Sequence, residues 1–153
     1  MTTEPKRILI VDDEPDILES LEEVLEAYSV SRASDFQSAR ELMDSRHFDV
    51  AILDIMGVRG YDLLEIAVRK EIPAIMLTAH ALTADDLIAS LSNGAFAYVP
   101  KDKLADIEEF VTEALEAQQV NPGGTGKWFE KLKPFFLGKF GSDAMTRIKG
   151  FYV

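Results

Sequence analysis

Four short apolar runs recur along the first hundred residues, and they constrain the fold more than any other feature of the sequence. They span residues 7–11, 48–53, 73–77 and 95–99, with a weaker fifth candidate at 28–33. Continuous apolar runs of this length, rich in β-branched residues, are typical of strands buried on both faces of a sheet. A layer of other elements must therefore cover each face.

Helical patterns occupy the segments between these runs. Residues 15–28 repeat apolar side chains at spacings of three and four with glutamates opposite, as an amphipathic helix does. We expect Asp13 or Glu14 to cap this helix, with Pro15 in its first turn. The same pattern predicts helices over residues 35–46, 62–70, 84–92 and 105–118. The alternation predicts an α/β fold: a doubly wound, five-stranded parallel sheet with helices on both faces.

Length and composition fit one ordinary globular domain. The chain has 153 residues, of which 47% are apolar and 28% charged, and this balance excludes a disordered or collagen-like chain. No apolar run approaches the roughly 20 residues of a membrane-spanning helix, and the N-terminus has no apolar signal segment. The absence of cysteine excludes disulfides and thiolate metal sites. A cytoplasmic protein is the simplest interpretation.

Charge divides the chain into two unlike parts. Residues 1–126 hold 10 Lys and Arg against 25 Asp and Glu, whereas residues 127–153 hold 6 against 2. The acidic body would repel nucleic acid. Residues 119–126, QVNPGGTG, have the composition of a flexible linker. We therefore predict a folded body at 1–118, a linker at 119–126 and a basic, aromatic tail at 127–153.

Acidic residues stand at the carboxyl ends of two predicted strands. Asp12 and Asp13 follow the first strand, and Asp54 ends the third. In open α/β sheets, ligands bind at this edge, where strand order reverses. Three carboxylates so close would raise one another's pKa unless a cation lay among them, and oxygen ligands suit Mg²⁺. The alternative, helix capping, stays open for Asp13, but Asp54 caps nothing obvious.

Two further strand ends add a hydroxyl and a cation. The fourth predicted strand finishes at Thr78, and Lys101 lies just beyond the fifth. Each residue alone is more often structural or solvated. Together with the acid cluster, they form a combination that could hold a phosphoryl group on one carboxylate.

The sequence resembles a known family, the receiver domain of two-component response regulators. The resemblance covers residues 6–118 and rests on four motifs: ILIVDDEPDILESL, VAILDIM, IMLTA and GAFAYVPK. It implies a (βα)5 receiver fold with strand order 2-1-3-4-5. It also implies a response regulator of a two-component system or phosphorelay, which acts in signal transduction rather than as an enzyme.

The resemblance implies a phosphoryl acceptor and a metal site. Asp54 would accept a phosphoryl group from the phosphohistidine of a histidine kinase or phosphotransfer protein. Asp13, Asp54 and the backbone carbonyl of Met56 would hold Mg²⁺, and Asp12 would act through water. The product would be an aspartyl phosphate, with autodephosphorylation as its decay.

Three other residues acquire roles by the same resemblance. Thr78 and Lys101 would contact the phosphoryl oxygens, and Tyr98 lies at the aromatic switch position of the family. This chemistry is sensible, because a transferring phosphoryl group spreads negative charge over three oxygens that a cation and a hydroxyl can stabilise.

The sequence departs from the family at two places. The loop IMGVRG between Asp54 and the following helix is about two residues shorter than usual and lacks its customary proline, which leaves the start of that helix open. The residue after Lys101 is Asp102 instead of proline. A cis bond before a non-proline residue costs about 2.5 to 4 kcal/mol, so the isomer of this bond is open as well.

Two alternative functions share these ingredients. A Mg²⁺-dependent phosphatase acting through an aspartyl phosphate usually carries a second Asp two residues after the nucleophile, where this chain has Met56. A degenerate receiver used as a scaffold would have lost key side chains, and here all are present. We expect no DNA-binding domain, because 27 residues follow the predicted linker, and output through contacts with an unknown protein target.

The tail segment 127–141, KWFEKLKPFFLGKFG, carries aromatic residues at helical spacing with lysines largely elsewhere. It predicts an amphipathic helical segment kinked at Pro134. Its apolar face must be buried, and three destinations are open: the surface of its own body, a second subunit in a homodimer, or an outside target such as a partner or an anionic membrane. Attraction between the acidic body and the basic tail favours the first two.

Overall fold

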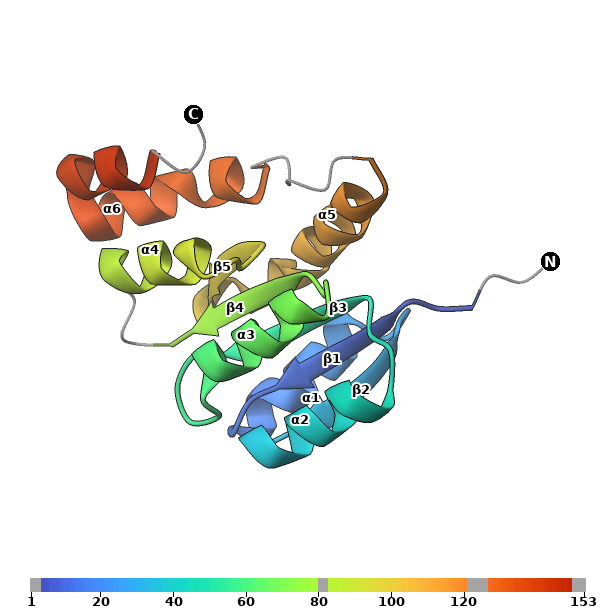
Figure 1. Cartoon of the computed structure of the whole chain (residues 1–153). Helices are drawn as coiled ribbons and strands as arrows, with labels where there is room; N and C mark the ends of the chain where they lie inside the picture. Colours follow the sequence, from blue (N-terminus) through green and yellow to red (C-terminus); the bar gives the residue numbers. More distant parts are fainter. Residues whose placement is uncertain (1–3, 80–82, 121–126, 150–153) are drawn as a thin grey trace.

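A computed structural model of the chain describes residues 4–79, 83–120 and 127–149. Its centre is a five-stranded sheet in the order β2-β1-β3-β4-β5, and all four strand pairs are parallel (Figure 1). The strands are β1 (Arg7–Val11), β2 (Ser29–Ala33), β3 (Val50–Asp54), β4 (Ala74–Thr78) and β5 (Ala97–Pro100). The predicted fold class and strand order are therefore confirmed.

Helices connect the strands and lie on both faces of the sheet, with α1 beside α5 and α2 beside α3 (Figure 1). They are α1 (Pro15–Val24), α2 (Phe36–Ser45), α3 (Gly60–Arg69), α4 (Ala84–Ser92), the 3₁₀ helix η1 (Lys101–Asp106), α5 (Ile107–Val120) and α6 (Lys127–Lys149). Every residue of β3 and β4 is buried, as expected of strands covered on both faces. The outer strand β2 is partly exposed.

Helix ends deviate from the sequence prediction in ways that local hydrogen bonds explain. Helix α1 ends at Val24 instead of residue 28, because the chain makes a turn in which the Tyr28 amide donates to the carbonyl of Leu25. Glu14 occupies the N-cap position of α1, but its side chain makes no capping bond. Asp35 and Thr83 do cap their helices, accepting from backbone amides three residues on.

The structure defines both the start of α3 and the isomer of the bond after Lys101, which the sequence left open. Helix α3 begins at Gly60, two residues earlier than predicted, and it is entered through Arg59 in the left-handed conformation at φ 55°. No peptide bond is cis in the ranges that the structure describes, so the bond between Lys101 and Asp102 is trans.

The tail is helical and packs on the body of its own chain. Helix α6 contacts α4 and α5, and three of its own side chains, Phe129, Leu132 and Phe136, are buried. The first of the three predicted destinations is thus the one seen. Pro134 lies inside α6, and a kink there stays a prediction. The residue with non-helical backbone angles in this helix is Gly141, at φ 81°, and the chain changes direction between the orange and red parts of α6 (Figure 1).

Two boundaries of the predicted division touch described elements. Helix α5 continues to Val120, so the first two residues of the predicted linker are helical. The remaining linker residues, 121–126, and the last tail residues, 150–153, lie outside the described ranges. The division at 118 and 126 stays a prediction.

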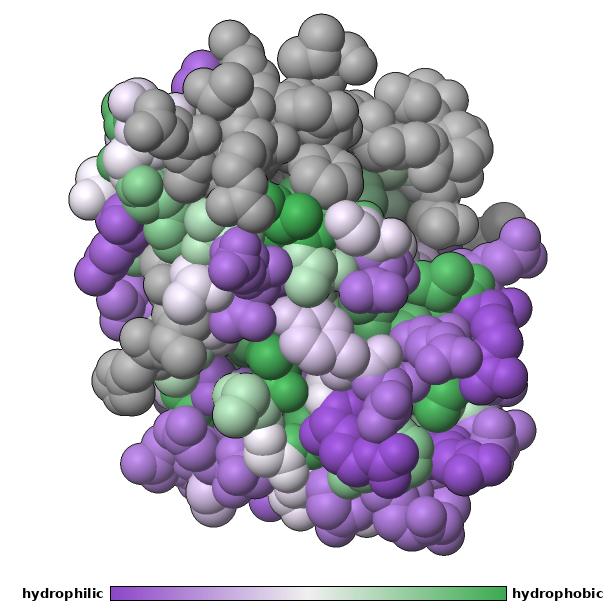
Figure 2. Space-filling view, turned by 60° about the vertical axis from the view of Figure 1, so that its left-hand side comes forward, coloured by the Kyte–Doolittle hydropathy of each residue, from purple (hydrophilic) through white to green (hydrophobic). Residues whose placement is uncertain are grey.

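Hydrophilic residues dominate the lower part of the face shown in Figure 2, with smaller hydrophobic patches between them. Three large apolar side chains are exposed in the described part of the chain: Met56, Val68 and Leu137. No helix found there is long and apolar enough to cross a membrane.

Candidate functional site

The carboxylates predicted at the strand ends do converge. Strands β1 and β3 are neighbours with Val11 opposite Leu53, which places Asp12 and Asp54 side by side at the carboxyl edge. Ligand oxygens of Asp12, Asp13 and Asp54 all lie within 4.8 Å of one another. Asp12 and Asp54 are buried, whereas Asp13 is exposed. The site is therefore open to solvent on the side of Asp13.

A single lysine holds this cluster together. Lys101, the first residue of η1 after β5, brings its Nζ to 2.9 Å from Asp12 Oδ2 and to 3.3 Å from Asp54 Oδ1. The same ammonium lies 3.3 Å from Oε1 of Glu14. The Lys101 side chain is only 9% exposed, so its pairs with the buried Asp12 and Asp54 are shielded from solvent, whereas the Glu14 side chain is 56% exposed. The sequence suggested Glu14 as a helix cap, but its carboxylate forms an ion pair with Lys101 instead.

A backbone hydrogen bond settles the capping alternative for this loop. The Glu14 amide donates to Asp12 Oδ1 at 2.9 Å, so it is Asp12 that supports the turn into α1. Asp13 therefore leaves its carboxylate beside the other two acids rather than in a capping bond.

The electrostatics of the cluster favour a bound cation. Burial raises the pKa of Asp54 to about 6, with the neighbouring Asp12 charge adding to the rise and Lys101 opposing it. Burial likewise raises the pKa of Asp12. Burial alone would lower the pKa of Lys101, but its contacts with Asp12 and Asp54 outweigh burial and raise it, which keeps the ammonium charged. The ammonium thus pairs with three carboxylates, and Asp13 adds a fourth to the cluster, an excess of negative charge that a divalent ion would offset.

Two glycines between the end of β3 and the first turn of α3 shape the site, and neither role was predicted from the sequence. A Cβ at Gly57, which has φ +85°, would lie 2.4 Å from Asp13 Oδ2, and one at Gly60 would lie 2.2 Å from the backbone oxygen of Asp54. A side chain at Gly60 would collide with backbone, and one at Gly57 would both strain the positive φ and displace the Asp13 carboxylate. The only signal in the sequence was the pair of glycines in IMGVRG.

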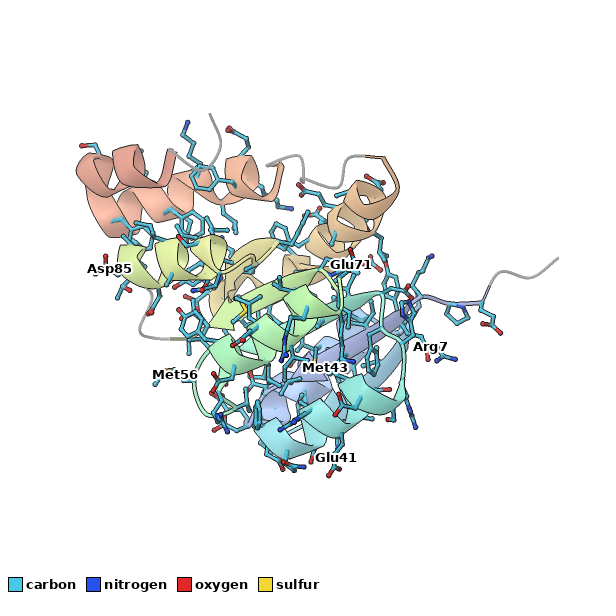
Figure 3. All side chains as sticks on the ribbon, in the orientation of Figure 1. Arg7, Glu41, Met43, Met56, Glu71 and Asp85 are labelled. Carbon is cyan, nitrogen blue, oxygen red and sulfur yellow. The ribbon has the colours of Figure 1, made fainter. Side chains whose placement is uncertain are left out.

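Met56 and Thr78 lie at the same edge of the sheet. The Met56 side chain is exposed, and Figure 3 shows it at the end of the molecule that also carries Asp85, opposite to Arg7 and Glu71. Its predicted role as a ligand thus concerns the backbone carbonyl alone. Thr78 is buried at the end of β4, one residue beyond Leu77, the partner of Asp54 in the sheet.

Tyr98 of β5 lies behind Thr78, and its ring is fully buried. Burial raises the pKa of its phenol far above the ordinary value, and the adjacent Thr78 hydroxyl opposes that rise. Asp86 of α4 is a further neighbour, and it accepts a hydrogen bond from the Tyr61 hydroxyl at 3.2 Å. The Tyr98 side chain is therefore directed inward, and its buried hydroxyl has no hydrogen-bond partner among the described residues.

Comparison with known proteins identifies the family. The model of the response regulator receiver domain matches residues 8–113, and the chain belongs to this family. The chain is similar to the CheY-like receiver domain protein from Methanospirillum hungatei JF-1, with a TM-score of 0.68 and 34% identity over 75% of this chain and 97% of that one.

Curated relatives are longer proteins. The chain is 36% identical over 118 residues to nitrogen assimilation regulatory protein NtrX of Azorhizobium caulinodans, which covers 71% of this chain and 26% of that protein. It is also 36% identical over 101 residues to a two-component response regulator of Arabidopsis thaliana, covering 62% of this chain and 16% of the relative. The similarity to both relatives thus spans about a quarter of their length or less.

Proposed function

We propose that this receiver domain is switched by phosphorylation of Asp54, with the phosphoryl group supplied by a histidine kinase or a phosphotransfer protein. The observation that carries the proposal is the buried Asp54 carboxylate, held 3.3 Å from Lys101 and beside Asp12 and Asp13 at the carboxyl edge of the sheet. A pKa of about 6 leaves Asp54 mostly ionised at neutral pH, so the nucleophile needs no general base.

The acid cluster supports a Mg²⁺ site. Oxygens of Asp12, Asp13 and Asp54 within 4.8 Å form the hard donor set that Mg²⁺ prefers, and Gly57 keeps the space beside Asp13 free of a side chain. Asp13, Asp54 and the Met56 carbonyl would hold the ion, with Asp12 acting through water. When bound, the ion would neutralise part of the negative charge on the phosphoryl oxygens.

The chain's own residues account for the transfer. An Asp54 oxygen attacks phosphorus, the new O–P bond forms as the P–N bond to the donor imidazole breaks, and the imidazole nitrogen takes a proton from solvent. Lys101, kept cationic by its carboxylate neighbours, stabilises the spread of negative charge on the phosphoryl oxygens. The Thr78 hydroxyl is the second group that would contact the phosphoryl oxygens.

Phosphorylation would act on the rest of the domain through Thr78 and Tyr98. Drawing the Thr78 hydroxyl toward the phosphoryl group favours the inward Tyr98 ring, whose phenol already lies beside that hydroxyl. The surface formed by α4, β5 and the overlying α6 would then differ between the two states, and an output protein would recognise the difference.

A labelling experiment tests the proposal. The purified full chain is incubated with a small-molecule phosphodonor and Mg²⁺, and intact mass is measured. We expect the mass of one added phosphate, lost when EDTA removes the ion. Asp54→Asn is expected to abolish labelling, because an amide does not attack phosphorus, whereas Asp62→Asn, a change at an exposed acid paired with Arg59, serves as the matched control. Stoichiometric labelling of Asp54→Asn would refute the assignment.

A further inference from the structure

Helix α6 presents one apolar face to the body and one face to solvent. Phe129, Leu132 and Phe136, at helical spacing, are 4%, 2% and 0% exposed, whereas the next residue, Leu137, is 47% exposed. The buried residues meet α4 and α5, which flank the outer strand β5 (Figure 1). The tail therefore packs through its apolar face on the surface formed by α4 and α5.

Phe136 is the centre of this interface. Its ring lies 6.3 Å from the Tyr98 ring, 6.0 Å from Phe129 and 5.7 Å from Phe140, the last of these stacked with it. Such ring pairs contribute beyond the area they bury. Of these partners, only Tyr98 belongs to the receiver, so Phe136 links the tail directly to the buried strand aromatic.

Charged contacts hold α6 to α5 independently of that ring. Lys131 forms an ion pair with Glu109 and also lies 5.9 Å from the centre of the Phe110 ring. Lys103 of η1 reaches to 5.5 Å from the Phe135 ring. These contacts position the helix, and Phe136 then closes the outer side of Tyr98.

We propose that α6 is a built-in partner of the receiver that holds Tyr98 inward, so that seating of α6 and phosphorylation of Asp54 favour each other. A Tyr98 ring turned outward would need the space that Phe136 fills. Seated α6 thus selects the inward ring, the same arrangement that a phosphoryl group favours through Thr78. Two events that select one conformation strengthen each other by equal factors. This inference rests on the proposed function.

The test uses the full chain, Mg²⁺ and beryllofluoride as the probe of Asp54. Phe136→Ala removes the ring against Tyr98, and Leu137→Ala is the matched control, since it truncates an exposed neighbour on the same helix. We expect Phe136→Ala to weaken beryllofluoride binding about five-fold or more, within the usual range of coupling between sites, and Leu137→Ala to leave it unchanged. In the wild type, beryllofluoride is expected to slow hydrogen exchange of backbone amides in residues 129–142.

The outcomes separate this inference from the proposed function. Equal beryllofluoride affinity in the wild type and Phe136→Ala, with unchanged exchange in α6, would overturn the coupling and leave Asp54 as the acceptor. Tighter binding of beryllofluoride by Phe136→Ala than by the wild type would show that α6 opposes phosphorylation, and would overturn the proposed positive coupling. Protection of α6 that depends on protein concentration would assign the helix to a second subunit and overturn the built-in partner. No binding to the wild type, together with no phosphate uptake, would refute the proposed function itself and this inference with it.

Discussion

Removing the charge of Asp54 is expected to stabilise the metal-free protein at neutral pH. The folded-state pKa of about 6 lies above the ordinary 3.8, so between these values the folded chain binds more protons than the unfolded chain. The free energy of unfolding therefore falls as pH rises from about 4 to about 6, and the destabilisation is fully present at pH 7. A difference of roughly two pKa units corresponds to about 3 kcal/mol. Asp54→Asn, neutral at every pH, avoids this cost.

Thermal and urea unfolding in EDTA measure the effect. For a domain of this size, 1 kcal/mol moves the melting temperature by about 2 to 4 °C, so we expect Asp54→Asn to melt about 6 to 12 °C above the wild type at pH 7. The gap is expected to shrink as pH falls toward 4 and to close below the ordinary pKa of 3.8, where Asp54 becomes protonated in both folded and unfolded chains. Added Mg²⁺ is expected to narrow the gap at pH 7 by stabilising the wild type through binding.

A matched variant controls for the change of net charge. Asp44→Asn removes one charge from an exposed surface pair with Lys70, 3.8 Å away, and such pairs contribute little. We expect its melting temperature to stay close to that of the wild type. A melting temperature of Asp54→Asn at or below the wild type at pH 7 would refute the reasoning, as would a difference between the two proteins that does not vary between pH 4 and pH 7.

Two further predictions concern the loop after β3 and the buried cation. Gly57→Ala, at φ +85° and with its new methyl 2.4 Å from Asp13 Oδ2, is expected to lower stability by about 1 to 2 kcal/mol and Mg²⁺ affinity about ten-fold in calorimetric titration. Gly138→Ala, which meets nothing within 4 Å, is the control, and equal Mg²⁺ affinity in both variants would contradict the displacement of Asp13. Lys101→Met is expected to slow phosphate uptake by about a hundred-fold while Mg²⁺ affinity holds or rises; unimpaired uptake would exclude a role in transfer.

Much of the fold could be predicted because its signals are local. Strand β1 and helix α4 have the predicted bounds, since apolar runs and helical spacing are properties of neighbouring residues. The end of α1 could not be placed, because a turn between Leu25 and Tyr28 replaced a helical pattern that continues to residue 28. A local hydrogen bond, which side-chain spacing does not reveal, thus accompanies the end of that helix.

The convergence of the charged side chains could be predicted from the sequence, whereas the close approach of the backbone at Gly57 could not. The order of strands brings Asp12, Asp54 and Lys101 together once the topology is known, so a motif at each strand end was enough. The role of Gly57 depends on a close approach to Asp13 that no pattern encodes. For the same reason, helical spacing identified Phe136 as part of an apolar face but could not name Tyr98 as the residue it meets.

Strand β5 closes one side of the sheet, yet all four of its residues are buried. An outer strand normally invites pairing with another chain, and proteins guard such edges with charges or with a covering element. The opposite edge, β2, is guarded by polar side chains, including Ser31 and Arg32. At β5, helix α4 packs against the strand and Phe136 of α6 lies against the Tyr98 ring. We therefore expect a chain shortened before α6 to be more prone to edge-to-edge aggregation during expression.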